Sequence, residues 1–265
     1  MKIYFIRHAE TVHNVGQTWA GTTNSALTNH GVLQIQRLAA FFRSAAVKFE
    51  HVFTSDLSRA VITAEGICNP NISDAQVMVT PLLREQHFGS REGIRIHAAT
   101  TASRSPPTVE PEPAETEESM RTRANRFLEE YLFPVLLSYD DDQTEKDSAI
   151  AIVAHGIILR VLWNCFMHAF PLGNVSYSPE VDALLATRGG ILVPFWSNTG
   201  YMELSVSRMS TTPSTRVESL LSGWTITVLS VDNKTHLRDL RRTRGGIGSL
   251  QHDTKQRSIE SFFKR

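Results

Sequence analysis

Two apolar stretches of this chain each end in a histidine, a side chain that can attack an electrophile or move a proton near neutral pH. Residues 3–6 lead directly into Arg7 and His8, and residues 148–154 lead into His155. Both stretches are rich in β-branched or aromatic residues and have the length of buried strands. Open α/β sheets bind ligands at the carboxyl ends of their strands. Both histidines and the neighbouring Arg7 are therefore candidate site residues.

Arg59 lies at a position that is unfavourable for a cation unless an anion is bound there. Residues 51–55 form a predicted strand, and a predicted helix begins soon after them with Arg59 in its first turn. The helix macrodipole opposes a positive charge at this end. A phosphate would be stabilised both by the helix N-terminus and by the guanidinium group. A solvated surface arginine is the alternative interpretation.

The residues around His8 resemble the signature of the histidine phosphatase superfamily, the phosphoglycerate mutase-like enzymes. That signature is Arg-His-Gly, then Glu-Thr, then Asn three residues later. Five residues of this chain match it: Arg7, His8, Glu10, Thr11 and Asn14. Ala9 replaces the signature glycine, which is used where backbone takes positive φ or passes close to a ligand. We therefore expect residue 9 to have negative φ and its methyl group to crowd whatever lies beside the phosphate.

Three further segments resemble the same superfamily. Residues 27–34 match its Leu-Thr-x-x-Gly-x-x-Gln sequence, and residues 153–156 match its second histidine motif, Val-Ala-His-Gly. Residues 83–93 resemble Leu-x-Glu-x-x-x-Gly-x-x-Glu-Gly, whose first glutamate donates a proton to the leaving group. Glu85 has that place in this chain. A loop carboxylate paired with a neighbouring arginine is the alternative interpretation of Glu85.

The resemblance implies phosphoryl transfer through a phosphohistidine. Neutral His8 would attack phosphorus in line, and Glu85 would protonate the departing alkoxide and later deprotonate water. Four residues would bind the equatorial oxygens of the phosphoryl group: Arg7, Asn14, Arg59 and His155. The arginines would supply the electrostatic stabilisation that a metal ion gives elsewhere. We therefore expect no metal and no other cofactor, and the sequence has no Cys/His/Asp cluster at metal-ligand spacing.

The predicted function is a phosphomonoesterase that acts through His8 on a small phosphorylated substrate. One alternative is phosphoglycerate mutase-type transfer, in which the phosphate is retained and returned. The segment between Gly93 and Ser119 lacks the basic pocket that a mutase uses. The other alternative is a phosphatase-like scaffold or binding module of a nuclear complex, with an intact but idle site.

The resemblance implies a three-layer α/β sandwich with a mostly parallel sheet over about residues 1–235. A helix is expected from about residue 115 to residue 139, kinked or ended at Pro134. Strands are expected at 201–206 and 224–231, joined by a polar connection that is too long for a tight hairpin. We expect these two strands to be antiparallel neighbours at the edge of the sheet.

Two segments differ in composition from the rest of the chain. Residues 98–119 contain four prolines and five glutamates with almost no large apolar side chain, which predicts an exposed insertion or lid. Residues 236–265 are predicted to form a basic tail. From residue 233 onward, nine Lys or Arg residues oppose three Asp or Glu.

The end of this tail resembles Gln-x-x-Ile-x-x-Phe-Phe, the motif by which replication and repair proteins bind the sliding clamp PCNA. The matching residues are Gln256, Ile259, Phe262 and Phe263. Ile259 and Phe262 are three apart, so one helical turn would present both to an apolar pocket. Flanking Lys and Arg residues would steer the tail toward an acidic surface. Folding of the apolar side chains back onto the domain is the alternative.

The whole-chain composition is that of an ordinary globular protein. The chain has 265 residues, 41% of them hydrophobic and 20% charged, with a formal net charge of zero. With no net charge, neither nucleic acid nor a membrane surface is expected as a direct partner. No apolar run has transmembrane length, and the first strand begins too early to leave room for a signal peptide. Cys68 and Cys165 are expected to be buried free thiols, so the expected location is cytoplasmic or nuclear.

Overall fold

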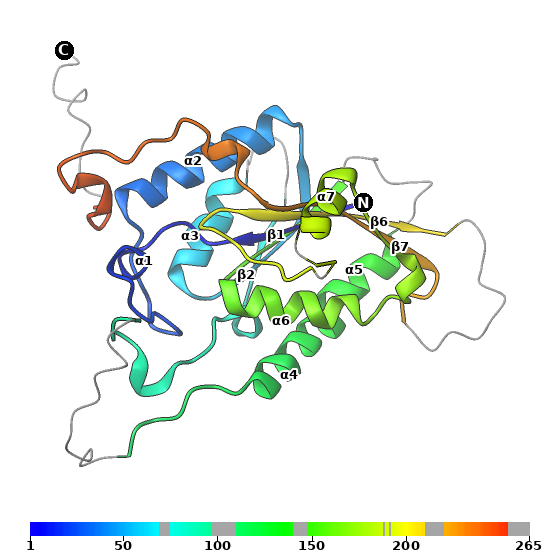
Figure 1. Ribbon diagram of the computed structural model, residues 1–265, viewed down its shortest axis with the longest axis horizontal. Helices are drawn as coiled ribbons and strands as arrows, with labels where there is room; N and C mark the ends of the chain where they lie inside the picture. The colour runs from blue at the N-terminus through cyan, green and yellow to red at the C-terminus, as the bar shows by residue number, and fades with distance from the viewer. Residues whose placement is uncertain are drawn as a thin grey trace.

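Strand β1 (Lys2–Arg7) lies inside the sheet around which the chain is folded. The computed structural model describes residues 1–68, 75–96, 110–139, 148–187, 189–190, 192–209 and 220–253. Seven strands of this described part form one sheet in the order β3-β2-β4-β1-β6-β7-β5. Helices cover both faces of the sheet, which gives three layers (Figure 1). The other strands are β2 (Lys48–Ser55), β3 (Val77–Thr80), β4 (Ser148–Ala154), β5 (Val175–Tyr177), β6 (Tyr201–Arg208) and β7 (Trp224–Asn233).

The four strands that carry the predicted site motifs are parallel to one another. β1 pairs with β4, β4 with β2, and β2 with β3. The register of the first pair sets Arg7 opposite Ala154, so His8 and His155 follow their strands at the same edge. The fold class predicted from the sequence, α/β with a mostly parallel sheet, is confirmed.

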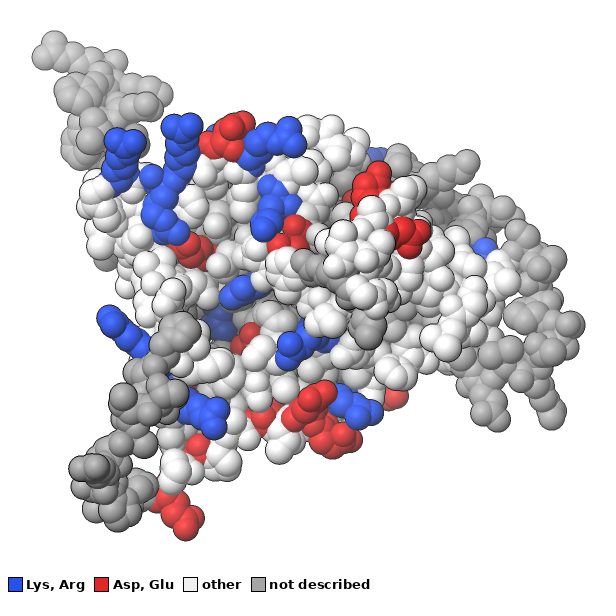
Figure 2. All heavy atoms as spheres, viewed as in Figure 1, with Lys and Arg blue, Asp and Glu red and all other residues white. Residues whose placement is uncertain are grey.

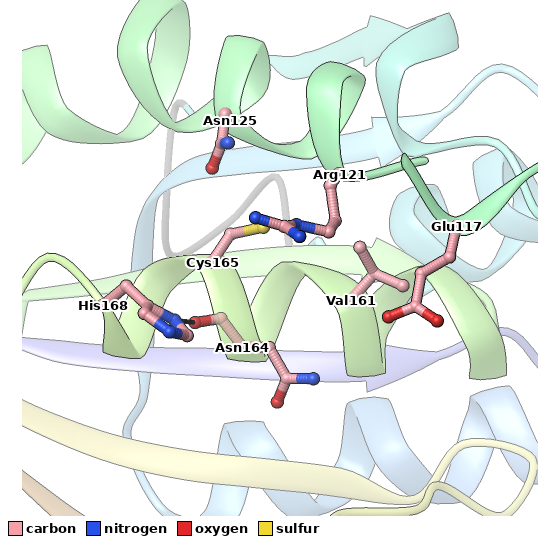
Figure 3. A pocket seen from close by; sticks show the side chains of 7 residues that line it. All are labelled: Glu117, Arg121, Asn125, Val161, Asn164, Cys165 and His168. Atoms are coloured by element: carbon pink, nitrogen blue, oxygen red, sulfur yellow. Dashed lines mark hydrogen bonds between the residues drawn. The ribbon is translucent and has the colours of Figure 1, made fainter. Parts of the chain in front are cut away.

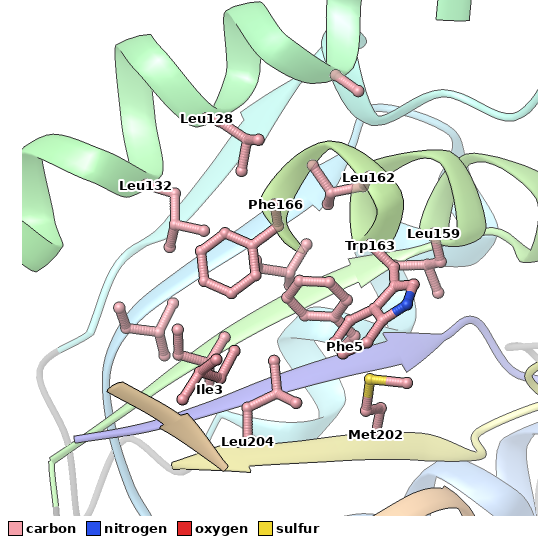
Figure 4. Packing of buried hydrophobic residues seen from close by; sticks show 14 of the residues in the cluster. Ile3, Phe5, Leu128, Leu132, Leu159, Leu162, Trp163, Phe166, Met202 and Leu204 are labelled. Atoms are coloured by element: carbon pink, nitrogen blue, oxygen red, sulfur yellow. The ribbon is translucent and has the colours of Figure 1, made fainter. Parts of the chain in front are cut away.

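Alternate side chains of β1 enter two separate cores. Ile3 and Phe5 pack in the larger core, beneath helices α4 (Glu117–Phe127), α5 (Phe133–Ser138) and α6 (Gly156–Met167). Figure 4 shows Phe5 and Phe166 of α6 facing each other in this core, and their ring centroids are 6.0 Å apart. A strand buried on both faces reads as a continuous apolar run, which is why residues 3–6 show no polar alternation.

Tyr4 and Ile6 point to the opposite face of the sheet. There they pack against helices α2 (Asn29–Ser44) and α3 (Ser58–Ile67), whose buried residues include Leu38 and Phe42. The apolar positions of α2 recur at helical spacing, so one face of the helix lies on the sheet. The remaining helices are α1 (Val12–Gly16) and α7 (Pro179–Thr187).

The last third of the sheet differs in part from the prediction. β6 and β7 are antiparallel neighbours, as expected. They are not at the edge of the sheet, because β6 pairs with β1 on its other side and β5 pairs with β7. The sequence analysis did not identify β5, a strand of only three residues. A strand this short is below the length at which a polar–apolar pattern can be recognised.

The predicted helix around Pro134 is present but interrupted. α4 begins after Thr116, whose hydroxyl caps it by accepting from the Ser119 amide, and it passes into a π-helical turn at Leu128–Leu132 before α5. Proline lacks an N–H, and a local change of helical hydrogen bonding before it accommodates this loss. Pro134 therefore changes the helix type and does not end the helix.

The segment after β7 lies against the domain as far as the structure describes it. We call residues 234–253 the C-terminal strap; it runs along α2 (Figure 1). The amide of Asn29 donates to the carbonyl of Leu250 (3.0 Å), and the amide of His252 donates to the carbonyl of Leu27 (2.8 Å). The predicted boundary near residue 235 stays a prediction, as does the lid at 98–119, of which residues 98–109 lie outside the described part.

Two expectations from the composition can be compared with the described residues. None of the described helices is both long and apolar enough to cross a bilayer. Cys68 and Cys165 are free thiols, and both are half-buried where full burial was expected.

Candidate active site

The two histidines that end β1 and β4 lie beside each other. Their ring centroids are 5.0 Å apart with an angle of 55° between the ring planes. His155 is fully buried, and His8 is 4% exposed. A phosphoryl group makes hydrogen bonds near 3 Å, so one such group can contact both rings. The adjacent parallel strands bring together residues that are 147 positions apart in the sequence.

The backbone fixes the protonation of His8. Nδ1 of His8 lies 2.7 Å from the carbonyl oxygen of Ala9, and a carbonyl oxygen only accepts, so Nδ1 carries the proton. Burial lowers the pKa of His8 well below its ordinary value, and the charges of Arg59 and Arg7 lower it further. His8 is therefore a neutral imidazole whose Nε2 bears a free lone pair.

Arg59 fixes the opposite tautomer in His155. Nε of Arg59 donates to Nδ1 of His155 at 3.2 Å, so the single proton of the neutral ring is on Nε2. Burial, and after it the charges of Arg59 and Arg7, lower the pKa of His155 well below its ordinary value. Among the described residues, this buried Nε2 has no hydrogen-bond partner. Buried donors are nearly always satisfied, so an acceptor from a ligand fits here.

Arg59 itself is held in the first turn of α3 and is 1% exposed. Its Nη1 donates to the carbonyl of Thr23 (2.8 Å) and its Nη2 to the carbonyl of Gly21 (2.7 Å). Burial lowers the pKa of Arg59 to about 10, so the guanidinium is still charged at neutral pH. Since guanidinium has five N–H donors and these contacts occupy three, the others remain for an anion.

Arg7 provides a second buried guanidinium at the same edge. Its Nη1 donates to the carbonyl of Trp196 at 2.9 Å. Its Nε is buried and has no hydrogen-bond partner among the described residues. Burial lowers the pKa of Arg7, and the nearby carboxylates of Glu85 and Asp232 oppose this effect. Arg7 and Arg59 together therefore form a site for an anion.

Asn14 lies in α1 with its carbonyl oxygen fully engaged. Oδ1 accepts from the Thr11 amide (3.0 Å) and from Nδ2 of Asn198 (3.1 Å). These contacts orient the Asn14 amide group. Its Nδ2 donates to no acceptor among the described residues and is available to a ligand. Asn198 also donates to the carbonyl of His8 at 3.0 Å. The sequence analysis missed Asn198, which lies just before β6, the antiparallel neighbour of β1.

Glu85 lies at the N-terminus of α6. Its Oε1 accepts from the amides of Gln86 (3.0 Å) and Ile158 (3.1 Å), and its Oε2 accepts from the amide of Ile157 (3.2 Å). The alternative was a loop carboxylate paired with Arg84 or Arg91. Arg84 pairs with Asp56, and no ion pair joins Arg91 to Glu85 among the described residues. The charge of Glu85 acts to raise the pKa of both Arg7 and Arg59, so the carboxylate lies near the two guanidinium groups.

The loop that carries Glu85 is held by Arg123 of α4, a residue that the sequence analysis did not identify. Nη1 of Arg123 donates to the carbonyls of Leu82 (2.8 Å) and Arg84 (2.6 Å), and Nη2 donates to the carbonyl of Glu85 (3.3 Å). Arg123 also pairs with Glu115 at 2.8 Å. One guanidinium therefore holds three backbone carbonyl groups within residues 82–85.

Glu92 holds the loop that binds Arg59, and it too was missed as a site residue. Its Oε1 accepts from the amide of Thr22 (2.9 Å), and its Oε2 accepts from the amide (2.9 Å) and the hydroxyl of Thr23. Gly21 has φ +52°, and a Cβ there would collide with the Glu92 carboxylate. Glu92 therefore fixes the carbonyl groups to which Arg59 donates.

Ala9 meets the first part of the expectation. Its φ is negative, because it is absent from the residues of positive φ. Its methyl group packs in a small core with Leu27 and Ile35. The Ala9 amide donates to the Thr63 hydroxyl at 3.1 Å. The expectation that the methyl group crowds whatever lies beside a phosphate stays a prediction.

A second cavity between α4 and α6 does not share these features. It has a volume of about 340 Å³, and Figure 3 shows Arg121, Cys165 and His168 among the side chains around it. Burial raises the pKa of the Cys165 thiol, an effect that the charge of Arg121 only partly offsets. A protonated thiol is a poor nucleophile, so this cavity is not the candidate site.

The face of the molecule shown in Figure 2 is hollowed near its centre, with basic side chains and an acidic one within the hollow. In the described part of the chain, no group of three or more His, Cys, Asp or Glu residues is arranged to hold a metal ion. The groups brought together here are two neutral histidines, two buried arginines, an amide and a carboxylate.

Comparisons with known proteins identify relatives of this chain. The chain is 37% identical to a probable phosphoglycerate mutase GpmB of Proteus mirabilis over 101 residues, 38% of this chain and 45% of that protein. It is 33% identical to the fructose-2,6-bisphosphatase TIGAR of Xenopus laevis over 140 residues, 50% of each chain. The chain thus spans about half the length of these curated relatives.

Solved structures show the same fold at lower identity. A structure titled mycobacterial hydrolase 1 has a TM-score of 0.60 and 20% identity, covering 88% of this chain and 98% of that one. The alpha-ribazole phosphatase from Shigella flexneri has a TM-score of 0.58 and 19% identity, covering 88% and 97%. The model of the histidine phosphatase superfamily (branch 1) matches residues 3–178, well over half of the chain. The chain therefore belongs to the histidine phosphatase superfamily.

Proposed function

We propose that this protein hydrolyses phosphomonoesters through a phosphohistidine at His8. Nε2 of His8 attacks phosphorus, the bond from phosphorus to the ester oxygen breaks, and Glu85 gives its proton to that oxygen. Water then attacks the phosphohistidine, Glu85 takes a proton from the water, and the nitrogen–phosphorus bond breaks to release inorganic phosphate. The reaction needs no oxidant, and water is the second substrate.

The observation that carries the proposal is the pair of opposite tautomers. His8 is neutral with its lone pair on Nε2, because Nδ1 donates to Ala9. His155 is neutral with its N–H on Nε2, because Nδ1 accepts from Arg59. One ring can therefore attack phosphorus while the other donates to a phosphoryl oxygen.

Charge supports the same assignment. A phosphomonoester carries close to two negative charges at neutral pH, and Arg7 and Arg59 provide two buried positive charges. Their unsatisfied N–H groups, with those of His155 and Asn14, can bind the equatorial oxygens. These donors are in place before substrate binds, and preorganised donors of this kind typically contribute ~10²–10³ each to turnover. The arginines thus take the place of a metal ion, and the proposal is that chelators leave turnover unchanged.

The proton donor is assigned from its hydrogen bonds. Oε1 of Glu85 accepts from two amides, and Oε2 accepts from one, that of Ile157. Oε2 therefore has room for the proton that the leaving group requires. Two of these three amides, those of Ile157 and Ile158, belong to the first turn of α6, which begins directly after His155, so the donor is fixed relative to the proposed phosphate-binding ring.

The proposal is tested with p-nitrophenyl phosphate and with a ³²P-labelled alkyl phosphomonoester. We expect acid-labile, alkali-stable label on the protein after rapid quenching, and release of inorganic phosphate at steady state. His8→Ala abolishes both. As a matched control, His51→Ala changes a half-buried histidine of β2 that lies away from these groups and keeps both activities. A wild-type protein that binds vanadate but forms no phosphohistidine would instead support the idle scaffold.

Mutase-type transfer is distinguished by the fate of the phosphate. A mutase returns the phosphoryl group to an acceptor hydroxyl, whereas a hydrolase passes it to water. Incubation of the ³²P-labelled enzyme with 3-phosphoglycerate should release inorganic phosphate only. Labelled bisphosphoglycerate would establish transfer. The named substrates of the relatives, among them fructose 2,6-bisphosphate, are the first candidates for a substrate screen.

The partner and location are proposed separately. The clamp motif of Gln256, Ile259, Phe262 and Phe263 lies outside the described residues and rests on the sequence alone. We propose that a peptide of residues 251–265 binds PCNA, which would place the protein in the nucleus as well as the cytoplasm. Titration by calorimetry should give micromolar affinity that is lost in a Phe262→Ala, Phe263→Ala peptide. In the full chain this double variant should keep its phosphatase activity and thermal stability.

A further inference from the structure

One ion pair links the C-terminal strap to the loop that carries His8. Both Nη atoms of Arg242 donate to the carboxylate of Glu10, with an Nη1–Oε1 distance of 2.7 Å. Glu10 is 8% exposed and lies two residues after His8. The two partners are 232 positions apart in the sequence. A bidentate contact of this kind restrains both distance and orientation.

Glu10 shares the peptide bond that determines the protonation of His8. The carbonyl group of that peptide belongs to Ala9 and accepts from Nδ1 of His8 at 2.7 Å. Its N–H belongs to Glu10 and donates to Oε1 of Gln34 at 2.9 Å. The orientation of this peptide plane therefore decides whether Nδ1 keeps its acceptor. Rotation about the backbone of Glu10 would turn the carbonyl away.

The side chain and the carbonyl of Glu10 oppose that rotation. Oε1 of Glu10 accepts from the Thr28 hydroxyl at 2.8 Å, and the carbonyl of Glu10 accepts from the Thr28 amide at 3.0 Å. Gly31 allows α2 to approach this closely, because a Cβ there would collide with the Glu10 carbonyl. Arg242 holds the same carboxylate from the solvent side, so Glu10 is fixed from two directions.

Charge at Glu10 agrees with this geometry. Burial alone would raise the pKa of Glu10, but hydrogen bonds from Arg242 and Thr28 outweigh it and lower the pKa below its ordinary value. Glu10 is therefore ionised at neutral pH, as a bidentate contact with a guanidinium requires. Figure 2 shows further basic side chains over the segment that follows β7. Arg241, the exposed residue next to Arg242 in the C-terminal strap, makes no ion pair with the described residues.

We propose that Arg242 is a positioning residue: through Glu10 it fixes the Ala9–Glu10 peptide, and so keeps the lone pair of His8 on Nε2. The inference rests on the proposed function of His8 as nucleophile. Arg242 touches neither substrate nor phosphorus. Its loss lowers the rate of phosphohistidine formation and leaves substrate binding unchanged.

The kinetic test compares Arg242→Gln with Arg241→Gln, an exposed neighbour in the strap. Arg242→Gln should lower kcat by about tenfold, less than the ~10²-fold that a 1 Å misplacement of reacting groups can cost, with KM unchanged. Arg241→Gln should match the wild type. Arg242→Gly should regain turnover in millimolar guanidinium chloride, and sodium chloride at equal ionic strength should not restore it. Rescue by the missing group is expected of a positioning role and not of a general loss of stability.

A second readout does not depend on turnover. In ¹⁵N-labelled protein, the ring-nitrogen shifts of His8 should show the Nδ1–H tautomer in the wild type and a mixture of tautomers in Arg242→Gln. The tautomer can be measured even if the wild type proves to be an idle scaffold. Failure of the proposed hydrolase function and failure of the positioning role of Arg242 can therefore be told apart. The positioning role is wrong if the tautomer is unchanged, if KM alone rises, or if only thermal stability falls.

Discussion

Arg59 donates from Nε to Nδ1 of His155 at 3.2 Å, and this one bond decides which nitrogen of the second histidine carries the proton. The same guanidinium also spans the carbonyls of Gly21 and Thr23. Arg59 therefore serves a structural and an electrostatic purpose with one planar group. Lysine is a point charge with no such fixed fork of donors.

We predict that Arg59→Lys lowers kcat/KM by roughly 10²–10³, the loss seen when one preorganised donor to a developing charge is removed. Lysine can neither hold the Nδ1 of His155 nor replace three oriented contacts at once. The measurement is the steady-state hydrolysis of p-nitrophenyl phosphate. Arg37→Lys, an exposed substitution in α2, is the matched control. Equal rates in Arg59→Lys and Arg37→Lys would show that only the positive charge at residue 59 is needed.

Ala9→Gly should separate packing from chemistry. The Ala9 methyl group is buried in a small core with Leu27 and Ile35. Its removal should cost about 1–2 kcal/mol of unfolding free energy, from one lost buried methyl group and added backbone freedom. Turnover should be equal or higher. Urea unfolding and steady-state kinetics measure the two effects, and a large loss of turnover would contradict this placement.

Arg123→Gln should reveal how much depends on the position of Glu85. The variant loses the donors that hold the loop before the carboxylate, so proton transfer to the leaving group should suffer. General acid help is typically worth ~10²–10⁴, and we predict a loss of about tenfold for alkyl phosphates. p-Nitrophenolate leaves without a proton, so its release should change little. Arg126→Gln, an exposed change on the same helix, should have no effect on either substrate.

His236 should make the protein less stable in acid. Burial lowers the pKa of His236 from 6.5 to about 4, and the charge of Asp232 offsets this only in part. Nε2 of His236 donates to the Thr199 hydroxyl, and the buried Nδ1 has no described partner for a second proton. The unfolded chain therefore binds that proton more tightly, and stability falls as pH drops from 6.5 through about 4.

The expected loss from His236 is up to about 3 kcal/mol at the acid end, from 1.36 kcal/mol for each pKa unit. His8 and His155, whose pKa values are also lowered, act in the same direction. In His236→Gln the amide can still donate to Thr199 but cannot take up a proton. Urea unfolding of the variant should therefore depend less steeply on pH than that of the wild type. If the unfolding free energy depends equally on pH in the two proteins, His236 is not a cause of the loss of stability in acid.

Local sequence patterns were sufficient to predict the fold and the central groups of the candidate site. β1 and β4 are buried on both faces, so each appears as an unbroken apolar run, and His8 and His155 follow directly. Arg59 could be placed because its helix begins at a recognisable strand end. These features depend on near neighbours in the chain, where periodicity and capping can be read.

The residues that hold those groups could not be read in this way. Asn198, Arg123 and Arg242 contact partners tens or hundreds of positions away. No periodic pattern marks such a contact, because it exists only once the layers have packed. Arg242 was assigned to a basic tail for this reason: its charge was visible in the sequence, and its partner Glu10 was not.

The position of β1 between β4 and β6 has a consequence for synthesis of the chain on the ribosome. His8 is translated before β4, which pairs with β1 from position 148 onward, and before β6, which follows from position 201. Until β4 has been made, His8 has no second histidine beside it, and until β6 has been made, one edge of β1 is unpaired. A nascent or prematurely terminated chain therefore lacks the paired histidines of the candidate site and exposes strand edges that favour aggregation. The candidate site can assemble only after both strands have been synthesised.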